Sequence, residues 1–170
     1  MAIDDCSHSF EILSAKVLPA YFEDLKNKIS APHSMKMFAE KGVGKQTILK
    51  SLNKKSDFPG CYVLIDGNEP IYVGISRSIV QRLSQHVKGA THYDASLAYR
   101  IASQNTPHTN QRNVAMSDQN FKQEFVNAKK YLKSLSVAFI EIQNDLEIYL
   151  FEAYCAMQLD TSKWNTFKTH

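Results

Sequence analysis

Apolar residues in the first third of the chain recur at the spacing of one helix face. Between residues 9 and 54 they stand three or four positions apart, at Phe10, Leu13, Val17, Tyr21, Leu25 and Ile29. Pro19 interrupts this pattern and predicts a kink or two shorter helices. A further helical piece is predicted to begin near Pro32. We therefore expect a helical extension over residues 1–57.

The pattern changes to that of short strands from Phe58 onward. Residues 61–65 and 70–73 are runs of aromatic and β-branched side chains, and the turn formers Asp66-Gly67-Asn68 follow the first run at once. Two such runs joined by a turn that contains Asp-Gly predict an antiparallel hairpin. A helix through Ile79, Leu83 and Val87 should follow, with Ser76 or Ser78 as its cap.

The rest of the chain alternates between helical and extended patterns. Helices are expected over residues 94–103, with Asp94 as cap, over 118–135 and over 146–159, with a strand over 137–142 and a loop over 105–113. The predicted fold is therefore α+β, a small three-stranded and mainly antiparallel sheet flanked by helices. Residues 58–170 would form this domain, and residues 1–57 an N-terminal extension packed into one compact unit with it.

Composition is that of an ordinary soluble globular protein, with 44% hydrophobic and 22% charged residues. No apolar run approaches the ~20 residues that cross a bilayer. The first ten residues carry two acids and no basic residue, so they do not resemble a secretory signal. We expect a cytoplasmic protein that does not enter a membrane.

Charge and cysteine content narrow the functional classes only slightly. A net charge of +3 permits a nucleic-acid partner without requiring one. Cys6, Cys61 and Cys155 are too far apart for a disulfide framework or for a zinc site of closely spaced pairs. We expect three reduced thiols that behave as small hydrophobic side chains.

Residues suited to phosphodiester hydrolysis gather in the predicted hairpin, the helix after it and the last helix. Tyr62 and Tyr72 would lie on neighbouring strands, so their phenol groups could converge. Arg82 and His86 are four residues apart and share a helix face. Arginine offers paired donors to phosphate, and histidine can move a proton near neutral pH. Glu152 is a candidate oxygen ligand for a magnesium-type ion.

The order and spacing of these residues resemble the GIY-YIG nuclease superfamily. Cys61-Tyr62-Val63 resembles the GIY element and Tyr72-Val73-Gly74 the YIG element. The family's Arg, ten residues after the second Tyr, and its following His match Arg82 and His86. Phe151-Glu152-Ala153 and Trp164-Asn165 resemble the ending of the family pattern. The resemblance covers residues 59–165 and leaves the N-terminal helices unexplained.

The resemblance implies a metal-dependent DNA endonuclease that uses a single Mg²⁺ or Mn²⁺ ion. Glu152 would bind this ion, and Asn165 would support the site. Glu147 is a rival ligand, but its distance from Trp164-Asn165 fits the family pattern less well. The longer segment between Ala95 and Leu135 would contribute to the DNA-binding surface.

The resemblance also implies roles for the remaining residues. Either Tyr62 or Tyr72 would accept a proton from the attacking water, and the sequence does not decide between them. Arg82 would hold the scissile phosphate. His86 would assist proton transfer or orient a tyrosine.

Two positions depart from the family pattern. Ile75 stands where many members have Lys, a residue that helps to depress a tyrosine pKa, and Arg77 is the nearby residue that could replace this charge. Cys61 stands where a small residue is usual.

Two alternatives therefore stay open beside the endonuclease. One is a catalytically weak or inactive nucleic-acid-binding module of the same fold. The other is a partner-dependent effector nuclease, whose N-terminal helices contact another protein. The sequence sets neither the target, the choice of DNA over RNA, nor the oligomeric state.

Overall fold

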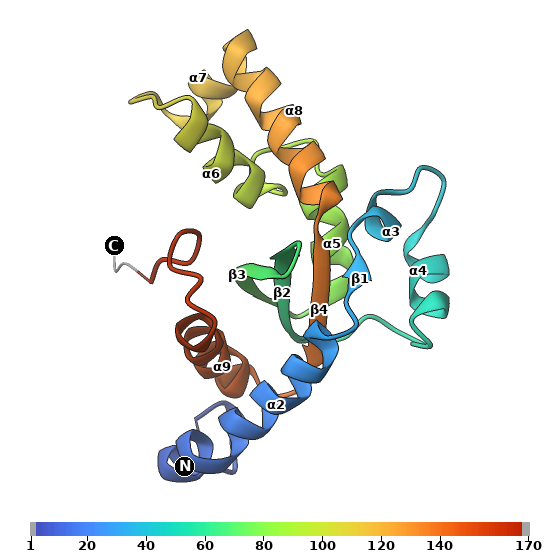
Figure 1. Cartoon of the computed structure of the whole chain (residues 1–170), viewed down its shortest axis with the longest axis vertical. Helices are drawn as coiled ribbons and strands as arrows, with labels where there is room; N and C mark the ends of the chain where they lie inside the picture. Colours follow the sequence, from blue (N-terminus) through green and yellow to red (C-terminus); the bar gives the residue numbers. More distant parts are fainter. Residues whose placement is uncertain (1–2, 168–170) are drawn as a thin grey trace. The chain divides into compact units, whose positions relative to one another are not determined.

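The computed structural model of the protein describes residues 3–167, which form two compact units (Figure 1). The first unit contains residues 3–33, 56–79 and 136–167, and the second contains residues 34–55 and 80–135. Residues 1–2 and 168–170, at the outer ends of the two predicted domains, lie outside the described residues.

The first unit is built on an antiparallel sheet whose strand order is β1-β4-β2-β3. The strands are β1 (His33–Ser34, of which His33 belongs to this unit), β2 (Gly60–Asp66), β3 (Glu69–Ser76) and β4 (Ser136–Glu141). β2 pairs antiparallel with both β3 and β4, so it is the central strand of the three that were predicted. The α+β fold with a small antiparallel sheet is confirmed, and the two-residue β1 adds a fourth strand.

The β2–β3 hairpin turns where the sequence predicts it. Gly67 has a φ of +59°, a left-handed conformation that costs glycine little because it has no Cβ. The register then pairs Tyr62 with Gly74 and Leu64 with Tyr72. Tyr62 and Tyr72 therefore lie on the same face of the hairpin, diagonally across the two strands.

The opposite face of the sheet carries the apolar core of the first unit. Cys61, Val63 and Val73 point to this face, where two helices cover them: α2 (Leu18–Ile29) packs against β4, and α9 (Asp145–Gln158) packs against β3 and β2 (Figure 1). The core members from the helices include Leu18, Leu25, Ile148, Phe151 and Cys155. Cys6, Cys61 and Cys155 are buried free thiols.

The N-terminal helical prediction holds, and the chain stays helical through Pro19. A short 3-10 turn (Ile3–Asp5) precedes α1 (Phe10–Ile12), which runs through a π-helical turn (Leu13–Val17) into α2. Pro19 has no N–H to donate to the preceding helical turn, and the π-helical turn lies directly before it. The sequence predicted a kink or two shorter helices; the structure has one helical segment with a wider turn before Pro19.

The second unit is helical. Its elements are α3 (Lys36–Ala39), α4 (Lys45–Ser51), α5 (Ile79–Lys88), α6 (Ser96–Asn105), α7 (Arg112–Ser117) and α8 (Gln119–Ser134). All of α5 except its first residue, Ile79, belongs to this unit. Asp118 caps α8 by accepting a hydrogen bond from the Phe121 N–H at 2.8 Å. Asp94 does not cap α6 as predicted, because its carboxylate accepts the Thr91 hydroxyl and α6 begins after Ala95.

Within residues 3–167, no helix combines the length and the apolar character that spanning a bilayer requires.

Gly60 is a position where the sheet leaves no room for a side chain. A Cβ there would lie 2.0 Å from the carbonyl oxygen of Ile140 in β4. We expect Gly60→Ala to lower the free energy of unfolding by about 2–3 kcal/mol, because backbone rather than a flexible side chain must move. Urea unfolding measures the loss. Gly44→Ala is the control, since a Cβ there meets nothing within 4 Å, and an equal loss in both variants would contradict the packing account.

Candidate active site

The two predicted tyrosines of the hairpin come together. The ring centroids of Tyr62 and Tyr72 are 6.2 Å apart, with the ring planes at 53°. Their exposures differ, because Tyr62 is only 1% exposed while Tyr72, on the edge strand β3, is half-buried. Of the two phenols, that of Tyr72 is the one more open to water.

Gly74 makes room for Tyr62. An added Cβ at Gly74 would lie 2.4 Å from the Cζ and Oη atoms of Tyr62, so the phenol ring occupies the space that a side chain would need. Gly60 is equally constrained on the other side of β2. The small residue of the GIY element is therefore Gly60, and the element is Gly60-Cys61-Tyr62. This corrects the alignment of Cys61-Tyr62-Val63 with the GIY element, which placed Cys61 at the position of the small residue.

Asn165 fastens the edge strand next to Tyr72. Its Nδ2 donates to the Val73 carbonyl oxygen at 2.7 Å, and its Oδ1 accepts from the Val73 N–H at 2.8 Å. Both backbone groups of a β3 residue are thus satisfied by one side chain on the open edge of the sheet. Asn165 was predicted to support the site, and this two-point contact is the physical means by which it can.

Glu152 projects from α9, the helix that covers the face opposite to the tyrosines. Its carboxylate is half-buried, and burial raises its pKa. Burial also raises the pKa of the Cys61 thiol, with further contributions from Cys155 and from the charge of Glu152. Glu152 therefore lies near the start of β2. That it shares a site with the tyrosines stays a prediction.

Glu147, the rival metal ligand, forms hydrogen bonds with residues of the N-terminal segment and α2. It is 5% exposed, and its carboxylate accepts hydrogen bonds from the Tyr21 hydroxyl at 2.6 Å and from His8 Nδ1 at 2.8 Å. Five residues separate Glu147 from Glu152, so their side chains leave α9 in directions about 140° apart. These contacts hold Glu147 against the N-terminal segment.

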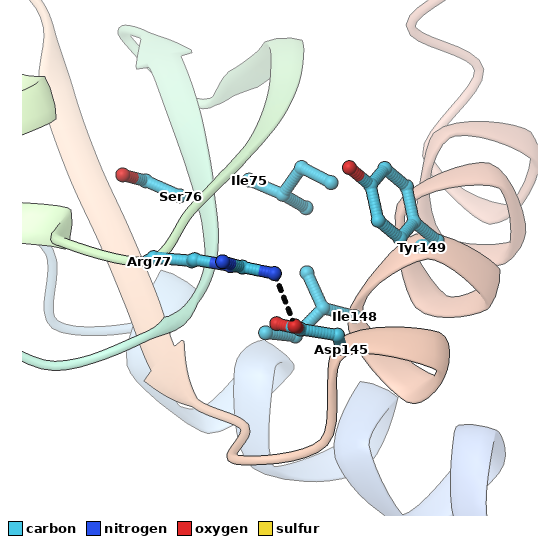
Figure 2. Close-up of a pocket in the computed structure, with 6 residues that line it drawn as sticks. All are labelled: Ile75, Ser76, Arg77, Asp145, Ile148 and Tyr149. Atoms are coloured by element: carbon cyan, nitrogen blue, oxygen red, sulfur yellow. Dashed lines mark hydrogen bonds and ion pairs between the residues drawn. The ribbon is translucent and has the colours of Figure 1, made fainter. Parts of the chain in front are cut away.

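Ile75, which stands where many family members have Lys, borders a small cavity between the end of β3 and the start of α9 (Figure 2). Ile75 lines this cavity with Ile148 and Tyr149 and packs against the apolar core. Arg77, the proposed replacement for a lysine, forms an ion pair with Asp145 (Figure 2). Its guanidinium is therefore directed to the first turn of α9.

In the second unit, Arg82 is held by two hydrogen bonds. Its Nη1 donates to the Asp94 carbonyl oxygen at 2.9 Å, and its Nη2 donates to the Ser96 hydroxyl at 3.0 Å. A guanidinium has five N–H donors, so these two contacts orient the group and leave donors for a phosphate. Asp94, which fails as a helix cap, thus serves Arg82 through its backbone.

His86 lies one turn further along α5 and is fully buried. Burial, and then the nearby charge of Arg82, lower the pKa of His86 to about 3. The imidazole is therefore neutral near pH 7. A proton shuttle requires a group that both gains and loses a proton near the working pH, and the lowered pKa of His86 does not meet this requirement. Of the two roles predicted for His86, positioning of neighbouring groups fits this burial better than proton transfer.

Comparison with known proteins identifies the family of the chain. Residues 58–155 match the family model of the GIY-YIG catalytic domain. Since the match covers more than half of the chain, the protein belongs to the GIY-YIG family, a family of nucleases. No curated protein and no solved structure matches the chain. The matched segment includes five of the six predicted site residues: Tyr62, Tyr72, Arg82, His86 and Glu152.

GIY-YIG nucleases generally use divalent metal ions, and one residue of this chain fits that requirement on α9. Glu152 is a partly buried carboxylate, and within residues 3–167 no ion pair offsets the cost of burying its charge. A nearby cation would favour the ionised form. Mg²⁺ often binds through one or two carboxylates and completes its shell with water and substrate phosphate, so a single glutamate is a sufficient protein ligand.

The contact between Asn165 and Val73 gives the clearest test of this region. Asn165→Ala removes both hydrogen bonds, so the Val73 amide should exchange with solvent at least tenfold faster, and the free energy of unfolding should fall by about 1–2 kcal/mol. Hydrogen exchange followed by mass spectrometry or NMR measures the first effect. Asn113→Ala, an exposed asparagine on α7, is the control. Unchanged protection of Val73 would mean that Asn165 does not hold the strand.

Proposed function

We propose that this protein is a metal-dependent DNA endonuclease that hydrolyses phosphodiester bonds. The observation that carries the proposal is the Tyr62–Tyr72 pair, on the hairpin of a segment that matches the GIY-YIG catalytic domain. A protein that only bound nucleic acid would have no need of two converging phenols beside a glycine that cannot be enlarged. The resemblance supplies DNA, rather than RNA, as the substrate.

Tyr72 is the tyrosine that we assign to the attacking water. Tyr72 is half-buried and keeps some contact with solvent, so it can receive or orient a water molecule, whereas Tyr62 is 1% exposed and enclosed by the sheet. Tyr62 then acts as a positioning residue, because its ring lies over Gly74 and next to Tyr72. The side chain of Asn165 fixes the backbone immediately after Tyr72.

Arg82 and Glu152 complete the proposed machinery. Arg82 would hold the scissile phosphate through donors that its contacts with Asp94 and Ser96 leave in place. His86, buried and neutral, would keep Arg82 oriented from the next turn of α5. Glu152 would hold the Mg²⁺ or Mn²⁺ ion, which when bound supplies positive charge to stabilise the departing oxygen.

The second unit offers charge for the DNA backbone. α8 contains four lysines and one glutamate, and Lys122, Lys130 and Lys133 are exposed. Lysines on one helix attract phosphates without reading sequence. This helix lies in the segment that the sequence analysis assigned to DNA binding, and it supports DNA as substrate more than the modest net charge does.

Ile75 favours a second candidate function. It places an apolar side chain where many family members have Lys, and Arg77 is paired with Asp145. Weakened proton abstraction would leave a module that binds nucleic acid with little turnover. This alternative predicts binding by the wild-type chain without cleavage.

Plasmid nicking tests the two functions against each other. Wild-type protein should nick supercoiled plasmid DNA when Mg²⁺ or Mn²⁺ is present and should not nick it when EDTA removes the metal. Glu152→Gln should lower the rate at least about 100-fold and leave DNA binding on a gel unchanged, because it keeps the size of the side chain and removes the charge. Glu11→Gln, an exposed glutamate of α1, is the matched control.

Two outcomes would change this account. A Glu152→Gln protein that nicks at the wild-type rate would remove Glu152 from the site. Wild-type protein that binds DNA but cuts under no metal would favour the binding module. In that case Ile75→Lys is the substitution expected to restore cleavage.

A further inference from the structure

Three side chains that can bind a metal ion meet in the first unit, and none of them is a proposed nuclease residue. They are Cys6 and His8, which precede α1, and Glu147 in the first turn of α9. One potential ligand atom from each lies within 4.8 Å of the other two. All three belong to the same unit, although 141 positions separate Cys6 from Glu147.

The distances between these atoms are close to those of a tetrahedral zinc site. Zinc bonds of about 2.3 Å to sulfur and 2.0–2.1 Å to nitrogen or oxygen place the ligand atoms about 3.3–3.6 Å apart. Cys6 Sγ lies 3.7 Å from Glu147 Oε1. His8 Nδ1 lies 2.8 Å from the same oxygen, the length of a hydrogen bond, so an ion requires the imidazole to move back by only about 0.5 Å.

The carboxylate of Glu147 is oriented from behind. The Tyr21 hydroxyl donates to Oε2 at 2.6 Å and leaves Oε1 directed to Cys6 and His8. Burial acts to raise the pKa of Glu147, but hydrogen bonds from Tyr21 and His8 outweigh it and the pKa is lowered. Such outer contacts are typical of groups that bind metals.

The N-terminal segment is also held in place by its backbone. Asn144 Nδ2 donates to the Asp4 carbonyl oxygen at 2.7 Å, and the Cys6 N–H donates to the Ile3 carbonyl oxygen at 2.9 Å. These contacts fix the loop that presents Cys6 beside the start of α9. Two ligands of the set thus lie on a segment already ordered for binding.

An approach for the ion is present beside the cluster. Cys6 and His8 border a cavity of about 370 Å³ whose other walls are apolar side chains, Ile3, Phe10, Leu13, Leu146 and Leu150. The side chain of His8 is 39% exposed, so one side of the site meets solvent. A water molecule can therefore supply the fourth ligand.

We propose that Cys6 Sγ, His8 Nδ1 and Glu147 Oε1 bind one Zn²⁺ ion, which joins the N-terminal segment to α9. Thiolate and imidazole ligands favour zinc over magnesium, so this site is chemically distinct from the one expected at Glu152. On binding, the Cys6 thiol releases its proton to solvent, and the imidazole proton of His8 shifts from Nδ1 to Nε2. The proposal does not depend on nuclease activity.

Cobalt and zinc titrations of the full chain, stripped of metal by a chelator, test this site. Co²⁺ should give a thiolate charge-transfer band and the strong visible absorption of a tetrahedral complex, at one ion per chain. Zn²⁺ measured by calorimetry should bind with one-to-one stoichiometry and raise the unfolding temperature. A wild-type chain with no thiolate band, or with no saturable zinc binding, would overturn the proposal.

Variants separate this site from the nuclease site. Cys6→Ser and His8→Ala should each weaken zinc binding at least about 100-fold and leave Mg²⁺-dependent nicking unchanged. His8→Ala is included because its exposed side chain can be removed without disturbing the core. Glu152→Gln should keep the zinc and the cobalt band. If His8→Ala binds zinc as tightly as the wild type does, the assigned ligands are wrong.

Discussion

The first unit depends on the close approach of β2 to the strands on both of its sides. At Gly60 the backbone of β4 occupies the place of a side chain, and at Gly74 the ring of Tyr62 does so. These two contacts fix the register of three strands and set Tyr62 beside Tyr72. Any side chain at either glycine would push the strands apart, and the arrangement of the tyrosines would change with them.

The sheet divides the work of the unit between its two faces. One face carries the apolar core under α2 and α9, and the other carries the tyrosine pair. Helix α9 joins several features, because it contributes core residues, the buried carboxylate of Glu147 and the half-buried carboxylate of Glu152. The two carboxylates differ through their surroundings: hydrogen bonds lower the pKa of Glu147, and burial raises that of Glu152.

Much of the fold could be predicted from the sequence, because its signals are local. The hairpin turn at Asp66-Gly67, the spacing of α8 and the helix irregularity before Pro19 each depend on a few neighbouring residues. Helix α7 was missed because it is one short segment in a polar stretch that reads as a loop. The cap at Asp94 was wrong because Thr91 offered that carboxylate a closer partner.

The candidate sites were less predictable, because they depend on contacts between distant parts of the chain. The pairing of Asn165 with the Val73 backbone spans 92 positions, and nothing in the local sequence of either residue signals it. Cys6 and His8 read as isolated residues until the fold sets Glu147 beside them. The alignment of the GIY element was shifted by one residue toward the C-terminus, because only the packing at Gly60 shows which position must stay small.

The central claim is that Tyr72 receives or orients the attacking water and that Tyr62 positions Tyr72. Single-turnover nicking measures this most directly. Tyr72→Phe removes one hydroxyl from a half-buried side chain and should lower the rate at least about 100-fold with DNA binding intact. Tyr62→Phe, made in parallel, should have the smaller effect on the rate, because its ring packing over Gly74 is kept. A Tyr72→Phe protein that nicks at the wild-type rate would contradict the account.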